Sequence, residues 1–298
     1  MARSLRQIVK IAGSNFRGWH KNPQIYLAFG LAFVFSFLLS DKVVVFAQQH
    51  NTVLQIIEPF IWTFGDAQSV LQISLIFLLL FADMPNLKNE VPFYLIRSSR
   101  KVWLFGQVLY QFVASLVLLF FITISICVLA GRHSYTANMW SETAAILGYS
   151  NIGQKIAVPA FVKVLELTFP YNCMIHIFLL LAGYSFFMTM LMLYFNLLRA
   201  KAGMIAGIIF SVFGFLMTPD VINSISFLRG SGLNRANIIF GWISPLNHAT
   251  YYMHNFGYDS LPRLWQSYIF FAAGGIIFLM LAMRKIKKYN FSFTGTQR

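Results

Sequence analysis

The chain has 298 residues, of which 58% are hydrophobic and 11% are charged. Soluble domains carry roughly 25% charged residues, so this composition excludes an ordinary soluble protein and predicts an all-α polytopic membrane protein. The net charge of +14 comes from cations that lie between apolar runs, which is typical of a membrane topology signal rather than of a nucleic-acid surface. The two cysteines, Cys127 and Cys173, lie in or beside apolar runs and predict neither a disulfide framework nor a metal site.

The N-terminal segment 1–23 combines an apolar stripe with a set of cations. The cations are Arg3, Arg6 and Lys10, and the apolar stripe contains Leu5, Ile8, Val9, Ile11 and Ala12. This pattern predicts a helix that lies in the inner membrane interface, with its cations toward anionic headgroups. The alternative is a disordered basic leader.

No nucleotide-binding motif is present in the sequence. Gly13 and Gly18 have the spacing of a phosphate-binding loop, but Trp19 and His20 stand where lysine and serine or threonine are required. The chain is therefore expected to bind no nucleotide or other cofactor itself.

Six apolar runs are candidates for membrane spans, each of which takes about 20 residues. A single transmembrane domain is predicted over residues 1–298, with spans at about 24–40, 60–82, 102–130, 171–198, 202–218 and 267–283 and a basic tail at 284–298. Only residues 199–201 separate the fourth run from the fifth, which predicts a tight hairpin turn.

The positions of lysine and arginine predict the orientation of the spans. Most of the 23 basic residues fall in four segments, which are 1–23, 83–101, 199–201 and 284–298. Cytoplasmic loops carry an excess of such residues. We therefore expect these segments, both termini included, on the cytoplasmic side of a bacterial plasma membrane.

The second apolar run is interrupted by the polar residues Asp66, Gln68 and Gln72. A charge near the bilayer centre is costly, so it faces the bundle interior or water. Gln68 and Gln72 are one helical turn apart, and the three residues are candidates for a solute pathway. The alternative is a helix that begins after Asp66 and leaves this acid in a wet outer loop.

The fifth run contains the pair Gly203 and Gly207, in the GxxxG spacing that lets two helices approach closely. The pair predicts a tight helix–helix contact. The sequence leaves open whether the partner helix belongs to this chain or to another.

Two longer segments are expected on the outer side. Segment 132–170 contains an apolar stretch that predicts a short external helix, and residues 236–246 of segment 219–266 are too few to cross and predict a re-entrant or interfacial excursion. His248 and His254 do not have the spacing of paired metal ligands. Because Tyr251 and Tyr252 lie beside them, we expect an interfacial aromatic belt and no metal site. No paired-carboxylate or other catalytic motif predicts an enzyme.

The charged elbow between the second and third runs, residues 81–107, has the features of a docking helix. Pro85 is expected to end the second span, and Pro92 suits the first turn of a new helix. Aromatic, apolar and charged side chains then share this short helix, which includes Glu90, Phe93, Tyr94, Ile96, Arg97, Arg100 and Lys101. The alternative is a plain basic loop.

The order of these elements, together with the stretch NEVPFYLIRSSRKVWLFGQVLY, resembles the permease subunit of type-2 ATP-binding-cassette (ABC) transporters of the exporter-like branch. The resemblance implies that the elbow is a coupling helix. It also implies a homodimer or heterodimer of permease chains in membrane lipid, mounted on separate ATPase subunits that hold ATP and magnesium. No nucleic-acid partner is expected.

The resulting expectation is a permease that exports a hydrophobic or amphipathic solute, such as a peptide, a lipid or a drug. Three alternatives stay open at this point. One is a passive channel or lipid scramblase, the second is a membrane-embedded enzyme, and the third is an ATPase-linked complex for antimicrobial-peptide sensing or immunity.

Overall fold

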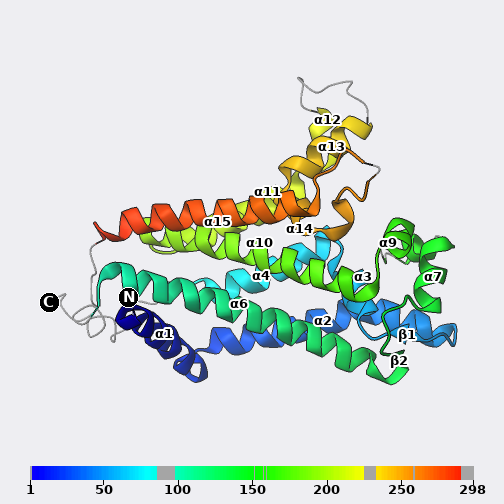
Figure 1. Cartoon of the computed structure of the whole chain (residues 1–298), viewed down its shortest axis with the longest axis horizontal. Coiled ribbons are helices and arrows are strands. Elements are labelled where there is room, and N and C mark those ends of the chain that lie inside the picture. Colours follow the sequence, from blue (N-terminus) through cyan, green and yellow to red (C-terminus); the bar gives the residue numbers. More distant parts are fainter. Residues whose placement is uncertain are drawn as a thin grey trace.

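The computed structural model describes residues 2–85, 98–150, 152–156, 158, 160–224, 233–257 and 259–289, and these are almost entirely α-helical (Figure 1). By length and composition, four of their helices can cross a membrane, and a bent pair of helices forms a fifth candidate. The prediction of an all-α membrane protein is confirmed.

Four long helices run side by side in the bundle (Figure 1). They are α2 (Pro23–Gln49), α6 (Arg100–Ala130), α10 (Pro170–Leu198) and α15 (Leu264–Ile286). A proline opens both α2 and α10, where its missing N–H costs nothing. The helix extends beyond the predicted span of about 24–40, because α2 continues through Asp41 and Lys42 and buries Val43, Val44, Phe46 and Ala47.

The second predicted span is a bent pair. α3 (Glu58–Phe64) and α4 (Ala67–Phe81) meet at an angle of 87°. α11 (Ala202–Leu216) follows α10 after the predicted hairpin turn, in which Lys201 adopts a positive φ of 64°. With 15 residues, α11 is about 22 Å long and shorter than the hydrocarbon core of about 30 Å, so length alone does not establish a sixth span.

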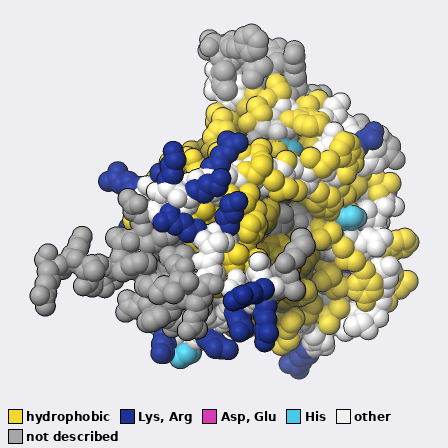
Figure 2. Space-filling view, turned by 60° about the vertical axis from the view of Figure 1, so that its left-hand side comes forward, with side chains coloured by type: hydrophobic (Ala, Val, Ile, Leu, Met, Phe, Trp, Pro, Cys, Tyr) yellow, Lys and Arg dark blue, Asp and Glu magenta, His cyan; other side chains and the backbone are white. Residues whose placement is uncertain are grey.

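One end of the bundle, which we call the basic end, gathers lysine and arginine side chains (Figure 2). It carries α1 (Ala2–Arg17) and the short turn η1 (Trp19–Lys21). A local core there joins Ile11 of α1 to Trp103 of α6, Leu197 of α10 and Ile286 of α15. Two hydrogen bonds of 2.9 Å connect the N-terminal segment to α6. Asn15 of α1 donates one to Gln107, and Trp19 of η1 donates the other to Tyr110. The predicted N-terminal helix therefore packs along α6, while Leu5 and Val9 stay exposed.

The opposite end, which we call the loop end, carries the short elements (Figure 1). Strands β1 (Leu54–Gln55) and β2 (Ser134–Tyr135) pair in parallel. The other elements are η2 (Gly131–His133), α7 (Glu142–Tyr149), α8 (Ile152–Lys155), α9 (Val162–Leu167), α12 (Pro219–Ser224), α13 (Leu233–Ile243), α14 (Pro245–Ala249) and η4 (Tyr251–Met253). α9 is the short helix predicted for segment 132–170, and α13 and α14 occupy the apolar stretch that is too short to cross.

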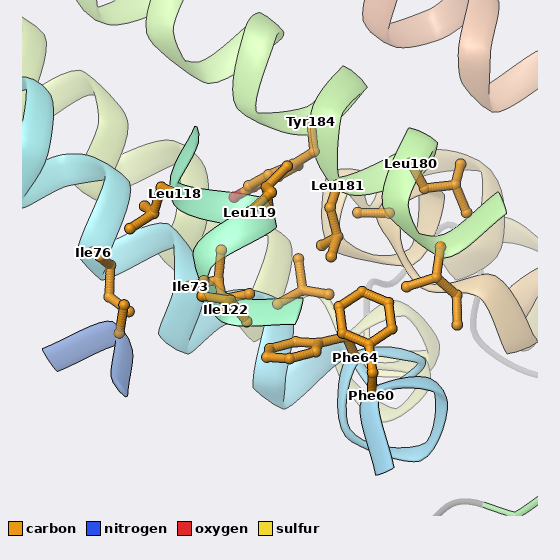
Figure 3. Packing of buried hydrophobic residues seen from close by; sticks show 14 of the residues in the cluster. Phe60, Phe64, Ile73, Ile76, Leu118, Leu119, Ile122, Leu180, Leu181 and Tyr184 are labelled. Carbon is orange, nitrogen blue, oxygen red and sulfur yellow. The ribbon is translucent and has the colours of Figure 1, made fainter. Parts of the chain in front are cut away.

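The main core lies where α3 and α4 meet α6 and α10. Figure 3 shows side chains from all four helices pointing toward one another, among them Phe60, Phe64, Ile73, Leu119, Ile122, Leu181 and Tyr184. The predicted glycine contact belongs to this chain: a methyl group at Gly203 would collide with α10 at Met192 and Asn196, and one at Gly207 with Leu78 of α4. These glycines bring α11 against α10 and α4.

Candidate functional site

A pocket lies at the loop end between α2 and the bent pair α3–α4. Its cavity volume is about 100 Å³, which is smaller than the roughly 300–1,000 Å³ of sites for drug-sized ligands and suits a small chemical group. Its walls contain Leu39, Lys42, Val43, Trp62, Thr63, Asp66, Gln68, Ser69, Gln72 and Val158. The pocket thus combines two opposite charges with polar side chains in a bundle whose helices are mainly apolar.

The position of α3 depends on the buried carboxylate of Glu58. This carboxylate accepts hydrogen bonds from the backbone N–H of Ser141 at 2.7 Å, from the Ser141 hydroxyl and from the backbone N–H of Gln55 at 3.3 Å. Glu58 and Ser141 are almost fully buried. Three donors stabilise a carboxylate that would otherwise be costly to remove from water. The first wall of the pocket is therefore tied to the segment that follows β2.

The bend between α3 and α4 is covered by Tyr252. A methyl group at Gly65 would collide with the Tyr252 ring, so glycine permits this close approach. The Tyr252 hydroxyl donates a hydrogen bond of 3.0 Å to the carbonyl oxygen of Ile61, and its ring stacks with Trp62 at 6.2 Å between centroids. The segment before α15 therefore supports the bend that begins the polar wall.

Asp66 starts α4 and fixes the direction of its first turn. Its Oδ2 accepts a hydrogen bond of 3.2 Å from the backbone N–H of Gln68, which is the usual role of aspartate as a helix N-cap. Ser69 and Gln72 follow at helical spacing on the side that lines the pocket. The predicted pathway residues Asp66, Gln68 and Gln72 therefore share one pocket, and the helix begins after Asp66.

Lys42 faces this wall from α2. It lines the same pocket as Asp66 and is close enough to interact with it electrostatically. In the part of the chain that the structure describes, the ion pair within 4.0 Å joins Lys163 to Asp259 at 3.7 Å, so Lys42 and Asp66 do not form a direct salt bridge. The pocket therefore contains one cation and one carboxylate that are not joined to each other.

Several polar atoms in the pocket residues have no hydrogen-bond partner among the described residues. They are Nε1 of Trp62, Oγ1 of Thr63 and Oε1 of Gln72. Most buried polar atoms in folded proteins are partnered, and each exception requires an explanation. The walls of this pocket therefore keep an unused donor in Trp62 and an unused acceptor in Gln72.

Sequence reasoning missed Lys42, Trp62 and Thr63 as pocket residues. Lys42 was placed beyond the end of the first span, yet α2 carries it three residues past Leu39 on the same face. A signal was present in the apolar run 43–47, which continues the helix after the charged pair. The contribution of α3 had no such signal, because it depends on the 87° bend.

Most of the predicted coupling helix, including Glu90, Phe93, Tyr94, Ile96 and Arg97, lies outside the described residues. Arg100 and Lys101 begin α6 at the basic end. The Arg100 guanidinium donates hydrogen bonds to the carbonyl oxygens of Lys287 at 2.8 Å and Tyr289 at 3.1 Å. Arg100 thus ties the start of α6 to the end of α15 and satisfies carbonyl groups that a helix end leaves free.

A second polar cluster lies near the pocket, and it corrects the predicted aromatic belt. His248, His254, Tyr251 and Tyr252 are buried in the protein. Nδ1 of His248 and Nε2 of His254 each lie 2.8 Å from the hydroxyl oxygen of Ser267. Sequence pattern alone placed these side chains at the membrane interface, whereas α14 and η4 fold inward against the start of α15.

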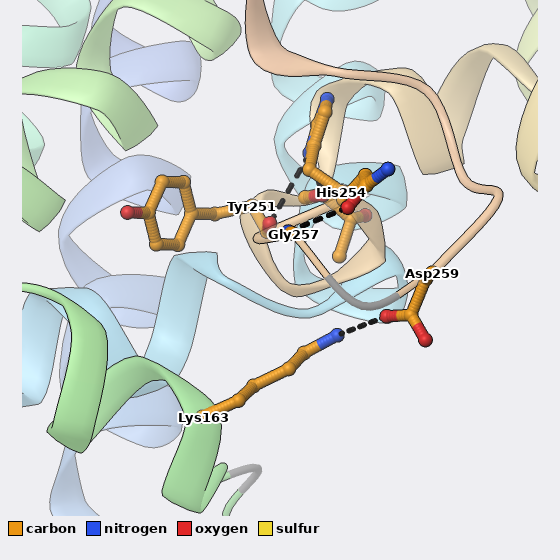
Figure 4. Close-up of polar contacts among 7 residues, drawn as sticks. Lys163, Tyr251, His254, Gly257 and Asp259 are labelled. Carbon is orange, nitrogen blue, oxygen red and sulfur yellow. Dashed lines mark hydrogen bonds and ion pairs between the residues drawn. The ribbon is translucent and has the colours of Figure 1, made fainter.

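The outer nitrogens of the two imidazoles face backbone carbonyl oxygens. His254 Nδ1 lies 3.1 Å from the carbonyl oxygen of Tyr251 (Figure 4) and 3.0 Å from that of Thr250. His248 Nε2 lies 3.0 Å from the carbonyl oxygen of Trp242. Burial lowers the pKa of His254 to about 4 and also lowers that of His248. Both imidazoles are therefore neutral at pH 7. In the described ranges no three histidine, cysteine or acidic side chains form a metal-binding group.

Comparison with known proteins identifies no relative. No family model matches the chain, and neither a curated protein nor a solved structure matches it.

Proposed function

We propose that the chain is the permease subunit of an ABC transporter of the exporter-like branch, which exports a hydrophobic or amphipathic solute. The observation that carries the proposal is the charged and polar pocket among apolar helices, which gives an amphipathic solute a polar site at the loop end. Intramembrane or near-membrane ionisable residues mark solute pathways in many membrane proteins.

The distribution of charge supports an orientation. The basic end carries α1, the start of α6 and the end of α15, and its cations lie on the surface (Figure 2). Because cytoplasmic segments are enriched in lysine and arginine, we place the basic end in the cytoplasm and the pocket near the outer surface of the plasma membrane. In this arrangement α11 is the short fifth span, and α13 and α14 form the re-entrant excursion.

The energy source in this proposal is a separate ATPase. The elbow before α6 supplies the contact, with Phe93, Tyr94 and Ile96 as its apolar part and Arg97 and Lys101 as its cations. The link between Arg100 and the end of α15 supports this role, since it connects the base of the elbow to a second helix of the bundle. A movement that the ATPase imposes on the elbow is then transmitted to both α6 and α15.

The test is retention of an ATPase by the tagged chain, purified from membranes of its own host. We expect a separate polypeptide with a phosphate-binding loop, and ATP-dependent transport after reconstitution. Removal of a central aromatic anchor commonly costs about 2 kcal/mol or more, which is roughly thirtyfold in affinity. The double change Phe93→Ala and Tyr94→Ala should therefore release the ATPase, whereas Lys101→Ala should have little effect.

The control is membrane insertion, which both variants should retain because the spans are unchanged. If the double variant keeps its ATPase and transports normally, the elbow is a charged loop. If no ATPase is retained by the unmodified chain and solute crosses without ATP, the chain is a passive channel or scramblase.

A further inference from the structure

The charges of the pocket restrict the chemistry of its ligand. Lys42 comes from α2 and Asp66 from the start of α4, and no direct salt bridge joins them in the described part of the chain. A ligand that carries only an ammonium group is attracted to Asp66 and repelled by Lys42. A ligand that carries only an anionic group meets the opposite pair of forces. A ligand with both groups satisfies both walls.

The rest of the pocket has both polar and apolar walls. Nε1 of Trp62 and Oε1 of Gln72 are buried and have no partner among the described residues, so the polar atoms that meet the ligand are those of the two charged side chains. Leu39, Val43 and Val158 complete the walls with apolar surface. Ligand sites commonly combine apolar walls with a few placed polar groups that fix orientation. The cavity volume of about 100 Å³ accommodates a small charged group, so a longer apolar portion of the ligand lies outside the cavity.

The location of the pocket also limits the ligand. Asp66 is fixed as the N-cap of α4, so its carboxylate cannot turn away without losing the hydrogen bond from Gln68. Lys42 is exposed at the opposing helix and has the flexible stem of a lysine, which lets its ammonium follow a bound group. One charge is therefore held in place and the other adapts to the ligand.

We infer that this pocket binds a zwitterionic group, with its ammonium on Asp66 and its carboxylate or phosphate on Lys42. This inference rests on the proposed function in one respect. If the chain is an exporter, the bound zwitterionic group is the head group of the exported solute. Two sources share this chemistry, namely a short peptide with free termini and the head group of an ethanolamine phospholipid.

The experiment uses the full chain alone, in nanodiscs of phosphatidylglycerol, which has no ammonium group. Isothermal titration calorimetry measures the binding of two zwitterionic probes, trileucine and lysophosphatidylethanolamine. The matched probes with a single charge are trileucine amide, N-acetyltrileucine and lysophosphatidylglycerol. We expect saturable binding of at least one zwitterionic probe, and roughly tenfold weaker binding of its analogues that lack one charged partner.

Two pocket variants and two controls complete the test. Asp66→Asn keeps a side chain that caps helices well, and Lys42→Gln changes an exposed residue, so both should fold. Each variant should bind the zwitterionic probe with roughly tenfold lower affinity. The exposed controls Asp220→Asn and Lys287→Gln, on α12 and beyond α15, should leave binding unchanged.

The outcomes separate the sources and the two proposals. Binding of trileucine alone indicates a peptide solute, and binding of lysophosphatidylethanolamine alone indicates a lipid. The inference is overturned if single-charge probes bind as tightly, if neither pocket variant weakens binding, or if no probe binds saturably. Because no ATPase is present in this experiment, such a result leaves the ATPase proposal standing, and loss of the ATPase proposal would leave probe binding unaffected.

Discussion

Two polar regions lie close together at the loop end, and they differ in how their polar atoms are satisfied. In the cluster of His248, His254 and Ser267, each imidazole nitrogen lies within 3.1 Å of an oxygen. In the pocket between α2 and α4, Trp62 and Gln72 keep polar atoms without partners in the described chain. One region contains neutral rings in a closed core, and the other contains opposite charges around an open space.

The difference separates structural polarity from candidate functional polarity. Buried polar groups that are fully hydrogen-bonded make a core specific and rigid, whereas unpartnered ones cost free energy. Histidines attract attention in a sequence because they can bind metals, yet here the hydrogen bonds indicate that they hold η4 and α15 together. The glutamines and the aspartate of α4 are less conspicuous in the sequence, but they line the pocket.

The largest effect should be the loss of the His254 contribution to stability on acidification. An exposed imidazole has a pKa near 6.5, and burial lowers that of His254 to about 4. The unfolded chain therefore binds the proton more tightly, so the stabilisation is present above pH 6.5 and is lost as the pH falls toward 4. Between pH 7.5 and 5 this contribution should fall by about 2 kcal/mol, measured in detergent as the difference in Tm decrease between the unmodified chain and the variant His254→Gln.

The variant His254→Gln should flatten this dependence, because an amide can both donate and accept but does not titrate in this range. His20→Gln changes an exposed histidine at the basic end and serves as the control. If the variant His254→Gln and the unmodified chain show the same decrease in Tm on acidification, His254 does not cause the pH dependence.

Ser267→Ala should have a smaller effect on stability. The Ser267 hydroxyl has one hydrogen and serves two acceptor nitrogens by rotation, so its removal deprives the cluster of about one hydrogen bond and should cost about 1–2 kcal/mol. Thermal unfolding at pH 7.5 measures the change. Ser185→Ala is the matched control, because Ser185 is also buried and, within the described residues, its hydroxyl donates to the Ala182 carbonyl of its own helix. Equal Tm values for the two variants would contradict a structural role of the cluster.

Gln72→Leu should have the smallest effect on stability and a clear effect on transport. Its Oε1 has no partner in the described chain, so an apolar replacement should change the free energy of unfolding by less than about 0.5 kcal/mol or stabilise slightly. If Gln72 lines the solute pathway, solute-stimulated ATPase activity or export should change while assembly stays intact.

The comparison variant for this change is Gln107→Leu. Gln107 is buried in the apolar helix α6, and its Oε1 accepts a hydrogen bond of 2.9 Å from Asn15. Loss of that acceptor should lower stability by about 1–2 kcal/mol. Unchanged transport in a stable Gln72→Leu variant would end the pathway interpretation of α4.

The sequence by itself determined the class of the protein and the approximate place of its helices. Apolar runs of span length admit few structures other than helices in a membrane, because backbone groups must be satisfied within the segment. The same local logic predicted the hairpin turn at 199–201 and the short helix α9. It also identified Asp66, Gln68 and Gln72, since polar residues in an apolar run are conspicuous.

Only the tertiary structure decided how these pieces meet. The 87° bend at Gly65 depends on Tyr252, which is 187 positions further along the chain, and no local pattern encodes that contact. Lys42 lines the pocket because α2 continues past Asp41 and Lys42. Burial of apolar side chains in the last turns of α2 stabilises this extension. His248 and His254 also depend on distant partners, since Ser267 and three backbone carbonyl groups lie within hydrogen-bond distance of the buried imidazoles. Local propensity and hydropathy describe one segment at a time, whereas burial and hydrogen-bond satisfaction are properties of the assembled bundle.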